Sequence, residues 1–246
     1  MSAPARAALV TGGARGIGRA IALDLARRGW QVAVGYRTSA GAAAETRAAI
    51  EAAGGRGLAL AGDVGDPEAV LRLGREVEAA FGRIDALVHA AGPFRRAALF
   101  DETPEAWRAT FDANLHSLYD LARVVVPGMR ARRWGRIVAF GLAGAERRAA
   151  PPAVLAYHVA KVGGLALVRA LARALAPDGI TVNAISPGFV DSGGTRGAEL
   201  EAMRPRIPAG RLGSVDDAVA AARFLLSEEA GYVTGTDLVV SGGWGL

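Results

Sequence analysis

The chain has 246 residues, of which 51% are hydrophobic and 22% charged, so it can bury a large core and is not a disordered chain. It contains no cysteine, which excludes disulfides, thiolate catalysis and zinc–thiolate or iron–sulfur centres. The formal net charge is +5, but the arginines are scattered through helical stretches rather than gathered in one block, so we expect no nucleic-acid partner.

Neither a membrane span nor a metal site is expected. No uninterrupted apolar stretch approaches the ~18 residues that a span needs, and the first residues lack the apolar core of a signal peptide. The three histidines, His89, His116 and His158, show no metal-ligand spacing. We therefore expect a cytoplasmic protein.

Short apolar runs alternate with amphipathic stretches of helical period along the whole chain. Strands are predicted at residues 7–11, 31–36, 57–62, 84–90, 136–140, 180–186 and 238–241. Helices are predicted near residues 17–28, 40–53, 67–81, 104–132, 154–176 and 215–228, with Gly29, Gly82 and Gly179 as C-terminal stops. This alternation implies right-handed crossovers between parallel strands. The alternative fold, an α/β barrel, would need eight strand–helix units. The pattern predicts an α/β fold with a doubly wound, parallel seven-stranded sheet in three α/β/α layers, formed by a single domain over residues 1–246.

A glycine-rich loop follows the first predicted strand directly. It runs from Thr11 to Gly18 and has glycines at positions 12, 16 and 18. Such glycines let the chain turn sharply, let backbone amides approach a pyrophosphate, and let the helix pack close to the sheet. Because 33 of the 246 residues are glycine, the pattern alone would also fit an ordinary strand-to-helix turn. Its position in the first βα turn favours an NAD(P)-binding Rossmann fold.

The end of the second predicted strand indicates which dinucleotide binds. Enzymes that use NAD place a carboxylate there for the ribose 2′-hydroxyl, whereas this chain has Arg37, Thr38 and Ser39. Arg37, assisted by Thr38 or Ser39 and by Arg15, is suited to a 2′-phosphate, although a solvated surface arginine is the alternative interpretation. We therefore expect NADP(H) to be preferred over NAD(H).

The only lysine of the chain, Lys161, follows Tyr157 by four residues inside a predicted helix. Residues four apart share one face of a helix, so the phenol and the ammonium can point into the same cleft. A nearby cation lowers the pKa of a phenol from its ordinary value of about 10 toward the working range, which suits tyrosine to proton donation. Together with a dinucleotide fold, the pair suggests hydride transfer with protonation by Tyr157.

These motifs resemble those of the short-chain dehydrogenase/reductase family, and within it the β-ketoacyl carrier-protein reductase-like branch. The resemblance covers essentially the whole chain. It rests on the order and spacing of the glycine loop at 11–18, Asp63-Val64, Ala90-Ala91-Gly92, Asn114, Tyr157-x-x-x-Lys161, residues 180–183, Pro187-Gly188, residues 210–213, Thr234-Gly235 and Gly242-Gly243.

The resemblance implies a homotetramer built on the helix with Tyr157 and on the C-terminal strand. It also implies a catalytic set of Tyr157, Lys161 and Asn114, in which Lys161 binds the nicotinamide ribose and Asn114 holds a water that relays protons to Lys161. The residues expected to bind the cofactor are Gly12, Arg15, Gly16, Ile17, Gly18, Arg37, Thr38, Asp63, Val64, Ala90, Ala91, Gly92, Tyr157, Lys161, Pro187, Gly188 and Val190.

One position departs from the family pattern. The family has a serine just beyond the fifth strand that hydrogen-bonds the substrate carbonyl, whereas the matching residue here is Leu142, which we expect to contact the substrate. No serine or threonine occurs between Arg136 and Tyr157. Loss of one oxyanion donor typically costs on the order of 10² to 10³ in rate, so hydride transfer would be weakened without being abolished.

Three functions are open on this basis. The first is NADPH-dependent reduction of a ketone or a 3-oxoacyl thioester, with Tyr157 as proton donor, alone or assisted by a backbone amide, Glu146 or His158. The second is reduction of a C=N or activated C=C substrate such as a pterin, an imine or a quinone. The third is a non-catalytic NADPH-binding regulatory protein, against which the retained Tyr157 and Lys161 argue.

Three further features are singled out. His89 stands where the family often has asparagine, and we expect a hydrogen-bonded structural histidine there. Ser192 or Thr195 takes the place of the threonine that holds the nicotinamide carboxamide in relatives. Residues 191–211 are interpreted as a mobile substrate lid or a plain surface connection.

Overall fold

The computed structural model describes residues 5–145, 152–193 and 197–245. Its main sheet has seven parallel strands in the order β3-β2-β1-β4-β5-β6-β9. This order confirms the predicted doubly wound sheet. The strands are β1 (Ala7–Thr11), β2 (Gln31–Tyr36), β3 (Gly57–Ala61), β4 (Ala86–His89), β5 (Gly135–Phe140), β6 (Ile180–Pro187) and β9 (Asp237–Val240).

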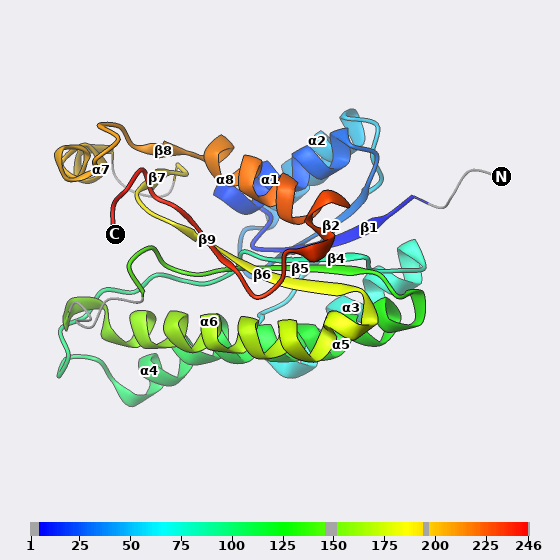
Figure 1. Ribbon diagram of the computed structural model, residues 1–246, viewed down its shortest axis with the longest axis horizontal. Coiled ribbons are helices and arrows are strands. Elements are labelled where there is room, and N and C mark those ends of the chain that lie inside the picture. The colour runs from blue at the N-terminus through cyan, green and yellow to red at the C-terminus, as the bar shows by residue number, and fades with distance from the viewer. Residues whose placement is uncertain (1–4, 146–151, 194–196, 246) are drawn as a thin grey trace.

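Helices cover both faces of the sheet, as Figure 1 shows, which confirms the three predicted layers. On one face lie α1 (Gly16–Arg27), α2 (Ala40–Ala52) and α8 (Val215–Leu225). On the other lie α3 (Pro67–Phe81), α4 (Pro104–Phe111), α5 (Ser117–Arg132) and α6 (Leu155–Leu175). One hydrophobic cluster fills the space under each layer, because the strands are apolar on both faces.

Local signals set several helix ends. Asp66 accepts a hydrogen bond from the Glu68 amide ahead of Pro67, and Thr103 accepts one from the Ala106 amide ahead of Pro104. The predicted stops are confirmed: Gly29, Gly82 and Gly179 have φ of +82°, +75° and +73°, a left-handed conformation that glycine adopts without strain.

The predicted continuous helix at 104–132 is wrong. The structure has α4, then a π-helical turn at Asp112–His116, then α5. Side chains in this turn bind backbone carbonyls: the Asn114 amide donates to Thr110 O at 3.0 Å, and the Ser117 hydroxyl donates to Ala113 O at 2.9 Å. Such bonds compete with the regular helical ladder, and a periodicity of apolar residues does not reveal the extra residue of a π-turn.

A small second sheet was also not predicted. It pairs β7 (Val190–Asp191) with β8 (Gly213–Ser214), and the short helix α7 (Gly197–Glu201) lies between them in the chain. Figure 1 places α7 at the end of the molecule toward which the strands of the main sheet run. The segment interpreted as a lid therefore lies at the carboxyl edge of the sheet, where doubly wound folds bind ligands.

The helix with Tyr157 is the most apolar long helix that the structure describes. On length and composition alone, the segment Pro152–Asp178 could cross a membrane. In the structure this helix packs against β6 and α4, and its buried residues include Lys161 and Leu165.

Candidate active site

The glycine loop has the geometry that its sequence predicts. Gly12 has φ +66°, and a Cβ there would lie 2.8 Å from the Ala91 amide nitrogen. A Cβ on Gly18 would lie 2.5 Å from the carbonyl oxygen of Gly12, so any side chain would separate helix from loop. Gly16 has φ +55°, and no side-chain hydrogen bond caps α1 at Arg15. The first amides of α1 are therefore available to an anion.

A cavity of about 230 Å³ opens beside this loop. Eight of the predicted cofactor residues line it: Gly12, Arg15, Arg37, Thr38, Asp63, Val64, Ala91 and Gly92. It is also lined by Ser39, which was predicted as an alternative to Thr38, and by Ala14, Gly35, Tyr36, Gly62, Pro93 and Ala113. The last six were missed, although all of them except Gly35 adjoin a predicted site residue in the chain. Five of the six are glycine, alanine or proline, whose side chains give no chemical signal in the sequence.

Two arginines and one aspartate carry the charge at this cavity. Arg15 and Arg37 line it, and an Arg37 Nη atom lies 3.4 Å from a carboxylate oxygen of Asp63, with both side chains exposed. The other Asp63 oxygen accepts from the Gly65 amide at 2.9 Å, which fixes the carboxylate. The end of β2 itself supplies the cavity with Arg37 and hydroxyl residues, as expected.

Tyr157 and Lys161 lie one turn apart on α6, with Nζ of Lys161 5.4 Å from the centre of the phenol ring. The lysine is buried and donates to Phe140 O at the end of β5, at 2.8 Å. Burial lowers the pKa of Lys161 to about 8 and raises the pKa of Tyr157 to about 12. The expected lowering of the phenol pKa is thus wrong for this structure, because burial disfavours the charged phenolate.

Asn114 meets Lys161 beside Gly92. The Asn114 amide nitrogen donates to Thr110 O and Pro93 O, while its Oδ1 is buried and has no hydrogen-bond partner among the described residues. A Cβ added to Gly92 would lie 2.6 Å from this Oδ1 and 3.2 Å from Nζ of Lys161. The two polar atoms therefore approach the same point, which the π-turn and the glycine together leave open.

The surroundings of Leu142 are apolar. Leu142 follows β5, is half-buried, and packs against the hydrophobic cluster of its layer.

Two aromatic pairs involve residues named above or their neighbours. Phe94 stands edge-on to the Tyr157 ring, with centroids 5.1 Å apart. Phe189 and Trp244 form a second T-shaped pair, with centroids 4.6 Å apart. Glu146, considered above as a replacement donor, lies outside the described residues.

The remaining predicted cofactor residues lie around the glycine loop and the end of β6. Ala90 packs near Gly18, and Ile17 packs on the hydrophobic cluster under α1. Pro187 ends β6 and accepts from the Ala143 amide at 3.3 Å. Gly188 and Val190 follow it into β7, and a Cβ on Gly188 would lie 2.9 Å from Ser241. These residues are outside the lining of the cavity described above.

Two alternatives are partly decided. His89 is a buried, hydrogen-bonded histidine at the end of β4, as expected. Ser192 lies against the glycine loop, 3.3 Å from where a Cβ on Gly16 would be. Thr195 lies outside the described residues.

Comparison with known proteins gives a family. A family model described as enoyl-(acyl carrier protein) reductase matches residues 12–245. The 3-oxoacyl-[acyl-carrier-protein] reductase FabG of Pseudomonas aeruginosa is 39% identical over 99% of this chain and 98% of its own length. The acetoacetyl-CoA reductase of Shinella zoogloeoides is 38% identical over 97% and 98%. The chain belongs to the short-chain dehydrogenase/reductase family.

Solved structures of this family share the fold closely. A short-chain dehydrogenase from Burkholderia cenocepacia in complex with NADP is 37% identical, with a TM-score of 0.89 over 98% of both chains. Acetoin dehydrogenase YohF of Salmonella typhimurium is 28% identical, with a TM-score of 0.89 over 98% of this chain and 96% of its own. The short-chain dehydrogenase/reductase described here is accordingly an NAD(P)-dependent oxidoreductase, and its resemblance to the 3-oxoacyl reductase branch is confirmed.

Proposed function

We propose that this enzyme transfers a hydride from NADPH to the carbonyl carbon of a ketone or a 3-oxoacyl thioester, giving an alcohol. The observation that carries the proposal is the meeting of Tyr157, Lys161 and Asn114 at the edge of a dinucleotide cavity. Relatives named as 3-oxoacyl and acetoacetyl-CoA reductases support the same substrate class. No metal takes part in this proposal.

In the proposed reaction Tyr157 donates a proton to the carbonyl oxygen as the hydride reaches the carbon. With its pKa raised to about 12, the phenol holds its proton throughout the neutral range. Lys161, a buried cation at neutral pH, stabilises the phenolate that is left and binds the nicotinamide ribose. Lys161 then passes a proton to that phenolate, which restores the Tyr157 phenol. A water that donates a hydrogen bond to Asn114 Oδ1 relays a proton from solvent to the neutral Lys161 amine.

NADPH is the proposed cofactor in preference to NADH. The cavity has Arg15 and Arg37 where the 2′-phosphate would lie, together with the hydroxyl residues Thr38 and Ser39. A phosphate favours such a set through charge-assisted hydrogen bonds. The NADP complex of the Burkholderia relative supports the same preference.

A second function is favoured by Leu142. Because a leucine replaces the serine that would hold a carbonyl oxygen, a substrate that needs no oxyanion donor fits the site as well. Such substrates have a C=N or an activated C=C bond, as in imines, pterins and quinones. The aromatic pair of Phe94 and Tyr157 suits a flat ring of this kind.

The test is NADPH oxidation measured by absorbance on an acetoacetyl thioester, simple diketones, a quinone and a dihydropterin, with Leu142→Ser assayed in parallel. Turnover on ketones or thioesters that rises in Leu142→Ser supports carbonyl reduction. Turnover confined to the quinone or pterin, and unchanged in Leu142→Ser, overturns it in favour of the second function.

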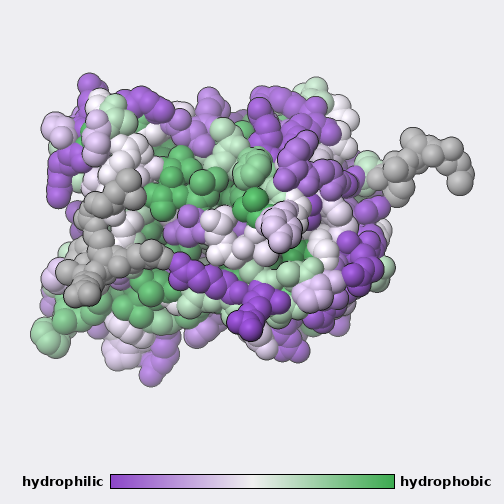
Figure 2. Space-filling view, viewed as in Figure 1, coloured by the Kyte–Doolittle hydropathy of each residue, from purple (hydrophilic) through white to green (hydrophobic). Residues whose placement is uncertain are grey.

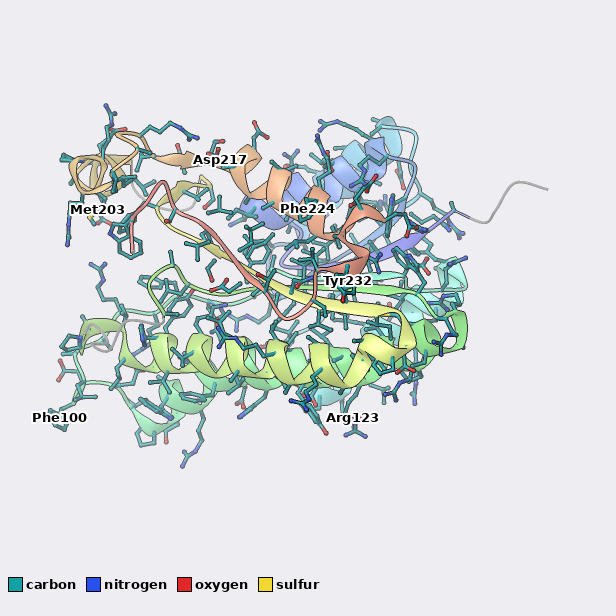
Figure 3. All side chains as sticks on the ribbon, viewed as in Figure 1. Phe100, Arg123, Met203, Asp217, Phe224 and Tyr232 are labelled. Carbon is teal, nitrogen blue, oxygen red and sulfur yellow. The ribbon has the colours of Figure 1, made fainter. Side chains whose placement is uncertain are left out.

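We further propose a homotetramer. Apart from Phe94, Leu99 and Phe100, which precede α4, the exposed large apolar side chains of the described residues lie in two places. They are Tyr119, Val159 and Val162 on α5 and α6, and Phe224, Tyr232 and Val239 on or beside α8 and β9. Figure 2 shows hydrophobic residues gathered over α8, and Figure 3 shows Phe224 and Tyr232 on that side of the molecule. Two separate apolar surfaces are what a tetramer with two kinds of interface requires.

A further inference from the structure

His89 bridges three elements that carry different parts of the site. It is the last residue of β4 and is 4% exposed. Its Nδ1 lies 2.8 Å from Oγ1 of Thr11, at the end of β1, and its Nε2 lies 2.9 Å from Oγ of Ser117, at the start of α5. Thr11 and Ser117 are both fully buried, so water does not compete for these bonds.

The hydrogens of this bonded chain have one consistent arrangement. The Ser117 hydroxyl donates to Ala113 O at 2.9 Å, so its oxygen accepts from Nε2–H of His89. His89 is then neutral with Nδ1 as acceptor, and the Thr11 hydroxyl donates to it. Thr11 Oγ1 also accepts from the Ala91 amide at 3.3 Å. The chain of bonds therefore runs without a break from the amide of Ala91 to the carbonyl of Ala113.

The neutral form of His89 is the form that this arrangement requires. Burial, together with the nearby charge of Lys161, lowers the pKa of His89 to about 3. An imidazolium would donate from both nitrogens, and the hydroxyl hydrogen of Thr11 would lose its acceptor. The bond directions thus stay fixed across the neutral range.

Both ends of the chain of bonds reach the cofactor cavity. Ala91 and Ala113 both line it. Ala91 precedes Gly92, and Ala113 precedes Asn114 within the π-helical turn. The atoms that meet beside Gly92 are therefore held by backbone segments that His89 connects.

We propose that His89 is a positioning residue, which couples the turn at Ala91 to the π-helical turn that presents Asn114. Its Nδ1 is connected through Thr11 to the turn at Ala91, and its Nε2 is connected through Ser117 to the π-helical turn. The value of this coupling for catalysis rests on the proposed function of Asn114. The coupling itself can be measured without a substrate.

Two substitutions of His89 separate the two ends. An asparagine amide reaches about as far as Nδ1, and a glutamine amide about as far as Nε2. His89→Asn should keep the Kd for NADPH within about twofold while amide exchange at residues 113–117 accelerates about tenfold. His89→Gln should weaken NADPH binding about tenfold with exchange at 113–117 within about twofold. Ser117→Ala should behave as His89→Asn does, and Thr11→Val as His89→Gln does.

Thr181→Val is the matched control, since Thr181 is equally buried at the start of β6 and should change neither readout. NADPH binding is followed by fluorescence titration, and amide exchange by mass spectrometry with and without NADPH. Equal effects of His89→Asn and His89→Gln on both readouts, or a change in the unfolding midpoint alone, would overturn the proposal. Failure of the proposed function would have a different signature. Tyr157→Phe would then turn over like the parent enzyme, while His89→Asn would still change only amide exchange and His89→Gln only NADPH binding.

Discussion

Tyr157 and Lys161 are one residue pair with opposite pKa shifts from a common cause. Burial disfavours whichever form is charged, so it holds the phenol protonated and weakens the hold of the lysine on its proton. The spacing of the pair in the sequence was enough to predict that they share a helix face. The direction of the phenol shift was not predictable, because the sequence does not reveal how deeply a side chain is buried.

Tyr157→Phe should lower turnover at least about 10²-fold and leave the Kd for NADPH nearly unchanged, because it removes the proposed general acid and little else. Single-turnover kinetics and fluorescence titration measure the two quantities. Tyr232→Phe, at a fully exposed tyrosine, is the control and should match the parent enzyme. Unchanged turnover in Tyr157→Phe would remove Tyr157 from the mechanism.

Lys161→Met should raise the unfolding temperature of the cofactor-free protein at pH 7. The pKa of Lys161 is lowered to about 8 in the folded chain from an ordinary 10.5, so burial of the charged form destabilises the fold below pH 8. The folded chain loses this proton near pH 8 and the unfolded chain only near pH 10.5, so the destabilisation decreases as pH rises between these two values. The gap between Lys161→Met and the parent should therefore narrow over that range in thermal melts.

The exposed Arg72→Met on α3 is the control for Lys161→Met and should show no such narrowing. Lys161→Met also loses the hydrogen bond from Nζ to Phe140 O, and this loss offsets part of the gain in stability. A lower unfolding temperature for Lys161→Met at pH 7 would contradict the expectation.

At the scale of elements, the seven strands and the helix stops followed from apolar runs and glycines, as at Gly82. The π-turn at Asp112–His116 and the β7–β8 pair did not. Both depend on contacts that a local pattern does not contain: side-chain bonds to carbonyls in the first, and pairing across more than twenty residues in the second. Asn114 was singled out by resemblance to the family, whereas its π-helical setting needed the structure.

We expect the end of β2 to determine the choice between NADPH and NADH. Arg37→Gln should lower kcat/KM for NADPH about tenfold or more and leave kcat/KM for NADH within about twofold, because only the 2′-phosphate loses a charge partner. Steady-state kinetics with both nucleotides measures this. Arg72→Gln, an exposed arginine on α3, is the control. An equal loss with both nucleotides would instead assign Arg37 to the pyrophosphate or to folding.

At the scale of the whole molecule, exposed apolar surface indicates assembly. Tyr232 is completely exposed and Val162 is 41% exposed, on different sides of the three-layer fold. Composition alone did not locate these surfaces, since it reports how much apolar area exists and not where it lies. The expectation of a tetramer came from resemblance, and it stays a prediction.

Light scattering after size exclusion should give four times the mass of one chain. Val162→Glu and Tyr232→Glu should each halve that mass, because each places a charge in one of the two proposed interfaces. The double variant should be a single chain. Arg72→Glu, which changes charge on α3 outside both surfaces, should remain a tetramer, and a tetramer for all variants would place the interfaces elsewhere.

The buried lysine also has a consequence for chemical labelling. Lys161 is the one side-chain amine in the whole sequence, so an acylating reagent has a single side-chain target, set at the edge of the cofactor cavity. With a pKa of about 8, a sizeable fraction of this amine is nucleophilic in mildly alkaline buffer. The rate of its acylation thus reports the occupancy of the site, and an amine-to-amine cross-linker finds no second side-chain amine within the same chain.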